Sequence, residues 1–176
     1  MMKKILKFFM YIALFIGSLI VFLPKESLYN FAEKELEKYQ IIVSNELRDE
    51  KIFALNVSNA DLYFEGINIG KLEEATFCSY FVYTKVNLEE LSLMSSFSVF
   101  LPSPISNITL KHSILNFNKV FIYSSGAFGE LNAQFDIFTK ILKVELNASK
   151  IMKDSYFKSL SYMKLENGVY TYEYKL

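Results

Sequence analysis

A pair of glycines is the first feature of the sequence that could bind a reactant. Gly126 and Gly129, in the segment SSGAFGELNAQFDI, have the G-x-x-G spacing of some phosphate-binding and nucleic-acid-binding loops. A Walker-type loop ends in G-K-[ST] and opens a helix, whereas Gly129 precedes Glu130, whose charge would repel phosphate. A nucleic-acid loop of this spacing needs flanking helices and basic neighbours, and the sequence offers neither. We therefore interpret the pair as the turn of a β-hairpin.

The single cysteine and the single histidine are the candidates for nucleophilic catalysis or metal binding. Cys78 could act with His112 as its base, and this pair is the only basis for an enzyme hypothesis. A metal site would need further nitrogen or sulfur ligands. His112 alternates with Leu110 and Ile114, which favours an ordinary position in a strand. We expect no catalytic, cofactor-binding or metal-binding residues.

Adjacent carboxylates and glycosylation triplets are the remaining candidates for chemistry. The carboxylates, which could act as general acid and base, stand where nothing suggests an apolar pocket, so we interpret them as solvated turn positions: Glu73-Glu74 and Glu89-Glu90. Three triplets match the N-x-[ST] pattern, at Asn56, Asn107 and Asn147. Only Asn147 also has an acidic residue two positions earlier, as in the stricter bacterial signal. It falls in an expected strand, and its glycosylation stays open.

The composition excludes some partners. Hydrophobic residues make up 52% of the 176 residues, which is too apolar for a disordered chain. Lys and Arg together number 19 and are balanced by 19 Asp and Glu, so no net positive field attracts nucleic acid. The 17 Phe and 12 Tyr favour β-structure. We therefore expect a folded, β-rich chain that does not bind nucleic acid tightly.

The first residues, MMKKILKFFMYIALFIGSLIVFLPKES, predict a membrane anchor. Only Lys7 interrupts the apolar run from Ile5 to Leu23, and about 20 residues cross a ~30 Å hydrocarbon layer. A cleaved signal peptide is the alternative, but it has a shorter apolar region and a small-residue cleavage site. Lys3 and Lys4 precede the run, whereas Lys25 and Glu26 cancel each other after it, which predicts an N-terminus in the cytoplasm.

Periodicity divides the chain into three parts. Residues 1–24 are the expected cytoplasmic tip and transmembrane anchor, and residues 25–40 an amphipathic linker helix that Ser27 caps. Residues 41–176 form the expected antiparallel β-rich domain. The apolar face of the linker helix is expected to contain Leu28, Phe31, Ala32, Leu36 and Tyr39.

Alternation of apolar and polar residues predicts the strands of this domain. The phase slips near Asn59, which predicts a bulge or tight turn. One strand is expected over Thr76–Val86 and a short helix over Ile151–Leu160. Residues 87–98 are ambiguous, because Leu88, Leu91 and Met94 suit a short helical turn whereas SSFSVF favours a strand. Asn167-Gly168 predicts a hairpin. The cleanest alternation covers residues 131–137 and 142–148. The fold class is thus one transmembrane helix plus α+β, mainly an antiparallel meander that forms a half-open sheet with a few short helices.

The organisation resembles a known family. The features are Phe22-Leu23-Pro24 at the end of the apolar segment, the strands around NADLYFEGI, and the SGAFGEL hairpin. Together they are similar to the type II secretion system protein N family, which is related in style to AsmA-like inner-membrane proteins. The resemblance implies a bitopic protein of the bacterial inner membrane, with its N-terminus cytoplasmic and most of the chain periplasmic. It also implies an accessory role in a secretion machine, or in a related DNA-uptake machine of natural transformation.

Two non-enzymatic hypotheses follow. In the first, the protein is a scaffold that binds partner proteins of a type II secretion or competence apparatus, with an edge strand as the docking site. In the second, it is an AsmA-like module that contacts or transfers lipid. The second hypothesis predicts an apolar groove, open to solvent and not covered by helices, that contains Leu131, Phe135, Leu142, Val144 and Leu146.

Overall fold

The computed structural model describes residues 2–22, 24–80 and 82–176. Leu23 and Phe81, which belong to the expected anchor and the expected strand over Thr76–Val86, lie outside these ranges. The helices are α1 (Met2–Val21), α2 (Lys25–Glu37), α3 (Lys150–Ser155), α4 (Phe157–Leu160) and the 3-10 turn η1 (Ile114–Asn116). The strands are β1 (Ile41–Ser44), β2 (Leu47–Glu50), β3 (Leu55–Phe64), β4 (Ile67–Tyr80), β5 (Tyr83–Leu93), β6 (Ile105–Ser113), β7 (Lys119–Gly126), β8 (Gly129–Asp136), β9 (Ile141–Ala148), β10 (Lys164–Glu166) and β11 (Val169–Lys175).

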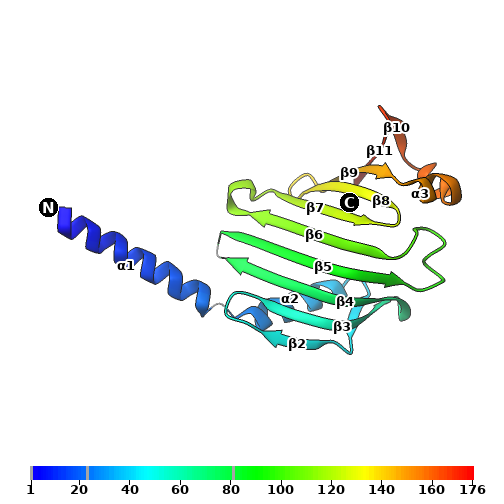
Figure 1. The fold of residues 1–176 in the computed structure, drawn as a ribbon. Helices are drawn as coiled ribbons and strands as arrows, with labels where there is room; N and C mark the ends of the chain where they lie inside the picture. The colour runs from blue at the N-terminus through cyan, green and yellow to red at the C-terminus, as the bar shows by residue number, and fades with distance from the viewer. Residues whose placement is uncertain (1, 23, 81) are drawn as a thin grey trace.

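The strands form one antiparallel sheet that follows the chain as a meander (Figure 1). The order is β1-β3-β4-β5-β6-β7-β8-β9-β11-β10, and β2 pairs with the same edge of β3 as β1 does. The predicted antiparallel meander is therefore confirmed. The strand expected over Thr76–Val86 is wrong, because the chain turns between Tyr80 and Tyr83 and pairs β4 with β5. Of the two alternatives for residues 87–98, the helical turn does not form at Leu88 and Leu91, since β5 continues to Leu93.

The strand register gives the sheet one apolar and one polar face. Across β3 to β11, the residues that pair in succession are Val57, Ala75, Leu88, Ile108, Ser124, Leu131, Leu146 and Tyr170. The row one position further along lies on the opposite face and consists of Asn56, Thr76, Asn87, Thr109, Tyr123, Asn132, Glu145 and Thr171. Because successive side chains point to opposite faces, this alternation places most of the apolar side chains on one side of the sheet, with Ser124 and Tyr123 as exceptions in these two rows.

The predicted phase slip at Asn59 is confirmed, and it extends over four strands. Asn59 has φ 58°, and burial shifts from Val57 to Ala60. Glu73 of β4 lies opposite Asn59, and Glu90 of β5, with φ 53°, lies at the same level. β6 also skips one position there, so the four strands stay paired on both sides of the irregularity. The slip is therefore a column of matched irregularities that keeps the apolar face continuous.

The expected glycine hairpin is confirmed. Gly126 ends β7 and pairs with Gly129, which begins β8 with φ +117°. A Cβ at Gly126 would meet Pro104 O at 2.8 Å, and a Cβ at Gly129 would overlap Asn147 O. The two glycines are thus required because other backbone segments pass close to the turn. The Asn167-Gly168 hairpin is also confirmed, with φ 51° and 86°.

The N-terminal helix requires a correction. Among the described residues, no helix combines the length and the apolar content needed to cross a membrane. Lys4 and Lys7 lie within α1, so its uncharged part runs from Phe8 to Val21. At ~1.5 Å per residue this part is about 21 Å long, short of a ~30 Å hydrocarbon layer. The expected transmembrane anchor is therefore wrong, and with it the single-pass, inner-membrane localisation. α1 projects away from the sheet (Figure 1).

The other helices cover the two ends of the apolar face. α2 lies against the face near β3 and β4 (Figure 1), as the predicted amphipathic helix, but its N-cap is Pro24 and not Ser27. One buried cluster lies there and contains Tyr29, Leu55, Val57, Ala60, Leu72 and Ala75. The expected helix over Ile151–Leu160 is present as α3 and α4. It covers a second buried cluster at the β8–β9 end, which contains Ile105, Phe128, Leu146, Ala148, Met152 and Leu160.

Candidate functional site

A large apolar cleft lies between α2 and the sheet. Its volume is about 620 Å³, within the range of small-molecule sites. We call it the α2 cleft. From α2 and the segment after it, its lining includes Tyr29, Phe31, Ala32, Glu33, Glu35, Leu36 and Tyr39. From the sheet it includes Ile41, Val43, Val57, Ala60, Leu62, Leu72, Ala75, Phe77, Val86, Leu88 and Leu110. The sheet contributes only apolar side chains, because its polar residues point to the other face.

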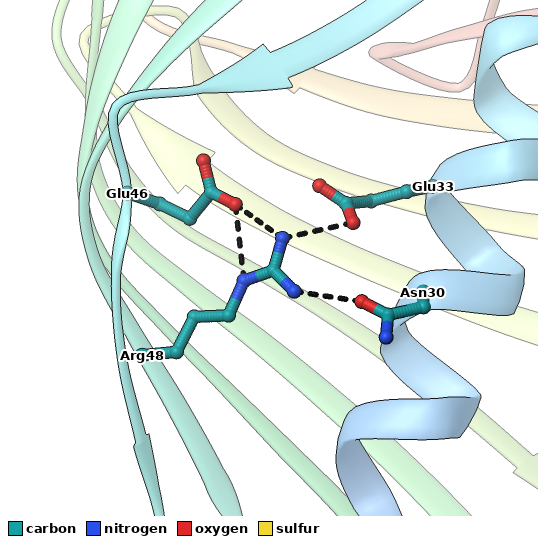
Figure 2. Close-up of polar contacts among 4 residues, drawn as sticks. All are labelled: Asn30, Glu33, Glu46 and Arg48. Atoms are coloured by element: carbon teal, nitrogen blue, oxygen red, sulfur yellow. Dashed lines mark hydrogen bonds and ion pairs between the residues drawn. The ribbon is translucent and has the colours of Figure 1, made fainter.

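An arginine at the edge of the sheet binds α2 beside the cleft (Figure 2). Arg48 of β2 donates to Asn30 Oδ1 at 2.7 Å and to Glu33 Oε2 at 2.9 Å, both on α2. Its Nε donates to Glu46 Oε1, before β2, at 3.0 Å. We call these four residues the Arg48 cluster. The planar guanidinium binds several acceptors at once, so it fixes the helix to the edge of the sheet in one orientation.

Tyr29 extends this attachment into the core. Its side chain is 6% exposed, and its ring meets that of Phe77 edge-on at 5.1 Å. The guanidinium carbon of Arg48 lies 4.5 Å from the centroid of the Tyr29 ring, which is within reach of a cation–π contact. Burial of the Tyr29 hydroxyl, together with the nearby charges of Glu33 and Glu46, raises the pKa of the phenol well above its usual range.

The charges of the Arg48 cluster stabilise one another. Burial alone would raise the pKa of Glu46, but the hydrogen bond from Arg48, a backbone hydrogen bond and the guanidinium charge outweigh it and lower that pKa. Burial likewise opposes the charge of Arg48, but Glu46 and Glu33 raise the pKa of its guanidinium. Both groups are therefore charged at neutral pH, and the cluster is a partly buried ion network rather than a reactive centre.

A second, smaller cleft lies at the other end of the apolar face. Its volume is about 270 Å³, and α3 and α4 adjoin it. We call it the α3–α4 cleft; its lining is Phe100, Leu101, Leu131, Val144, Leu146, Met152, Ser159, Tyr162, Met163 and Tyr172. Three residues of the groove expected from the sequence line this cleft, namely Leu131, Val144 and Leu146. Leu146 is buried against Met152 of α3, so helices cover much of the expected groove.

The register separates Cys78 from His112. Cys78 pairs with Lys85 and shares the polar face with it, whereas His112 pairs with Thr84 and Val120 and lies on the face of Leu110. The two residues are on opposite faces, with β5 between their strands. His112 Nε2 lies 3.1 Å from Phe117 O. The structure thus does not bring the two candidates for nucleophilic chemistry together.

The carboxylate pairs lie in strands, not in turns. Glu74 of β4 is directly opposite Glu89 of β5, and both are exposed. Asn87 Nδ2 donates to Glu89 Oε1 at 2.6 Å. Residues 2–22, 24–80 and 82–176 contain no group of three or more His, Cys, Asp or Glu side chains placed to hold a metal ion. The three Asn-x-Ser/Thr asparagines lie in strands as well: Asn56 in β3, Asn107 in β6 and Asn147 in β9.

Comparisons with protein-family models, with curated proteins and with solved structures give no match for this chain. The resemblance to the type II secretion system protein N family therefore stays a prediction. Function has to be inferred from the geometry of the clefts and of the sheet.

Four residues of the expected apolar helix face line the α2 cleft: Phe31, Ala32, Leu36 and Tyr39. Leu28 does not line the cleft and is 45% exposed, and sequence reasoning missed Tyr29, which is buried, and the Arg48 cluster. A weak signal was available, since Arg48 is the only arginine of the chain and Glu33 offers it a complementary charge from the helix. These complementary charges alone do not indicate that β2 and α2 are in contact.

Proposed function

We propose that the protein is a non-catalytic binding protein whose α2 cleft holds the acyl chain of a lipid or a similar long apolar chain. The observation that carries the proposal is the cleft of about 620 Å³ between α2 and the apolar face of the sheet. Apolar pockets of this size bury most of the surface of a small ligand. Val86, Leu88 and Leu110 extend the lining toward the middle of the sheet, which suits an elongated ligand.

Ligand affinity would come from burial of apolar surface. The charged side chains of the lining are Glu33 and Glu35, and both already have partners, in Arg48 and Lys38. Neither is placed to anchor a head group, so the head group would stay in solvent and the chain would occupy the cleft. Each buried methylene contributes about 0.8 kcal/mol. Affinity should therefore depend on chain length more than on head-group charge.

Binding can be measured with a dansyl-labelled fatty acid and the full-length protein. We expect a blue shift and increased emission on binding, and displacement by unlabelled fatty acids and fatty alcohols. Lengthening a competitor by two methylenes should strengthen its binding roughly tenfold until the cleft is full. An acid and an alcohol of equal length should compete about equally.

Two variants on one face of the sheet distinguish the cleft from the rest of that face. Leu110→Gln places an amide in the α2 cleft, whereas Ile122→Gln changes its direct partner in β7, which does not line the cleft. Both side chains are half-buried, so the two substitutions have similar effects on folding. We expect Leu110→Gln to weaken probe binding at least tenfold and Ile122→Gln to leave it within about twofold. Equal effects, or no binding by the wild type, would refute the proposal.

The role of a scaffold in a secretion-type or DNA-uptake apparatus also stays a proposal. Its support is the resemblance and the presence of a sheet edge that could accept a partner strand. Co-purification of secretion-type proteins with the full chain tests it. Recovery of lipid without a stable protein partner would instead favour the acyl-chain function.

A further inference from the structure

One edge of the sheet is only half covered. β10 pairs with Val169–Thr171 of β11 through its three residues and then ends. The rest of β11, from Tyr172 to Lys175, pairs with β9 on one side and has no strand on its other side among the described residues. A cleft of about 390 Å³, whose lining includes Lys164 and Glu173, lies beside it, so space next to the strand is unfilled. A backbone edge of this kind can bind another strand.

The opposite edge of the sheet is occupied by local contacts. β1 lies beside α2, and β2 holds Arg48, which is bound to α2 and to Glu46. Charged residues and short strands are the usual protection of an edge. The open half of β11, in contrast, alternates aromatic and charged residues. Tyr172 is 40% exposed, Tyr174 49% and Leu176 71%.

We propose that this open half of β11 binds the same segment of a second copy of the chain, as an antiparallel pair centred on Tyr174. In this register Tyr174 faces Tyr174 of the second copy, and Tyr172 faces its Leu176. Glu173 faces Lys175 of the second copy, and Lys175 faces its Glu173. One side of the pairing is thus apolar and the other carries two opposite-charge pairs, the combinations that stabilise neighbouring strands.

The neighbouring registers are unfavourable. Centring the pair on Glu173 or on Lys175 would place two like charges directly opposite each other, which destabilises a strand pair. A slip of one residue would put Glu173 against Tyr174 and align the polar face of one copy with the apolar face of the other. A parallel arrangement in register would again place like charges side by side. The charge pattern therefore selects a symmetric, two-fold dimer that extends the sheet.

The proposal does not depend on the α2 cleft, and charge reversal tests it. Lys175→Glu would place a carboxylate opposite Glu173 of the second copy, and Glu173→Lys would place two ammonium groups opposite each other. We expect the full-length wild type, in a mild detergent that masks α1, to show a concentration-dependent monomer–dimer equilibrium by sedimentation. Each variant alone should raise the dimer dissociation constant roughly tenfold or more.

A mixture of the Lys175→Glu and Glu173→Lys variants provides the decisive test of the proposed register. The Lys175→Glu chain then offers two acids to the two lysines of the Glu173→Lys chain, so a heterodimer should form with near wild-type affinity. Lys150→Glu, which changes the charge equally at the start of α3, is the matched control and should leave dimerisation unchanged. Amide hydrogen exchange should show protection of residues 172–176 in the dimer. A monomeric wild type, a dimer insensitive to Lys175→Glu, or failure of the mixture to associate would overturn the proposal.

Discussion

The α2 end and the α3–α4 end share one apolar sheet face but cover it differently. α3 follows β9 directly, with Ser149 as its N-cap: Met152 N donates to Ser149 Oγ at 3.1 Å. Ser149 also binds the glycine hairpin, because its N donates to Phe128 O and its Oγ to Ala127 O. α2 has no such link to the middle of the sheet among the described contacts. Its attachment lies at the edge and consists of the Arg48 cluster, the ion pair of the buried Lys25 with Glu50 of β2 at 3.8 Å, and the buried ring of Tyr29.

The difference explains where the large cleft lies. A helix joined to its sheet by backbone contacts and by a buried Phe128 leaves about 270 Å³, whereas a helix held at one edge leaves about 620 Å³. Protein interiors are close-packed, so a persistent apolar space of the larger size requires a cover that is held away from the sheet. The Arg48 cluster joins α2 to β2 at the edge, so it holds the helix there and not against the middle of the sheet.

Truncation of the buried ring at each end tests the comparison most strongly. Phe128 is 2% exposed at the α3–α4 end, and we expect Phe128→Ala to lower the free energy of unfolding by about 4 kcal/mol. Tyr29→Ala should cost less, about 2–3 kcal/mol, because the new space joins an existing cleft. Urea unfolding measures both, and Phe157→Ala, at an exposed position, should cost less than about 1 kcal/mol. A larger loss of unfolding free energy for Tyr29→Ala than for Phe128→Ala would contradict the tighter packing of the α3–α4 end.

The second prediction removes the polar attachment of α2. Arg48→Met keeps much of the side-chain volume but leaves Glu33 and Glu46 without their cation, so we expect a loss of about 2 kcal/mol. Amides of α2 should exchange faster, while those of α3 should not change. Lys143→Met is the counterpart at the other end, where the pair with Glu173 is exposed, and should cost less than about 0.5 kcal/mol. Unchanged exchange in α2 would show that the Arg48 cluster does not hold the helix in place.

The smallest effect is a difference in acid sensitivity. The pKa of Glu46 is lower in the folded protein than its ordinary value of 4.5, so its ion pair stabilises the fold above that pH. This stability is lost as the pH falls through the folded-state pKa. Between about pH 5 and pH 3 the wild-type Tm should therefore fall by about 2–4 °C more than the Tm of Glu46→Gln.

Exposed Glu166 supplies the control for this measurement. Glu166→Gln should retain the wild-type dependence of Tm on pH, since Glu166 lies in β10 with an exposed side chain. At neutral pH Glu46→Gln should be the less stable of the two variants, and the curves of wild type and Glu46→Gln should approach each other in acid. Parallel curves would show that Glu46 does not stabilise the α2 end.

Much of the sheet could be predicted from the sequence because local rules decide it. Alternation in residues 131–137 and 142–148, and the turns at Gly126–Gly129 and Asn167-Gly168, depend on pleat geometry and on positive φ. The turn between Tyr80 and Tyr83 could not be predicted, since no Gly, Pro or Asn marks it. Only the pairing of β4 with β5 in the folded sheet, with Tyr80 opposite Tyr83, shows where this turn lies.

The cleft itself depends on contacts between distant residues. Arg48 and Asn30 are 18 positions apart in the sequence, and no local pattern indicates that they meet. For the same reason the sequence does not indicate that Tyr29 and Lys25 are the buried residues of α2. The prediction of a transmembrane anchor failed for a different reason. The apolar run from Ile5 to Leu23 includes Lys7, and the uncharged part of α1 is shorter than that run.

The matched irregularities at Asn59, Glu73 and Glu90 have a consequence for how this sequence can change. Each occupies the same level of its strand, and β6 follows them. Deleting the extra residue from one strand would turn the remainder of that strand over, so its apolar side chains would point into water. The four strands are therefore coupled in length, and a deletion in one would be tolerated only if the other three changed with it.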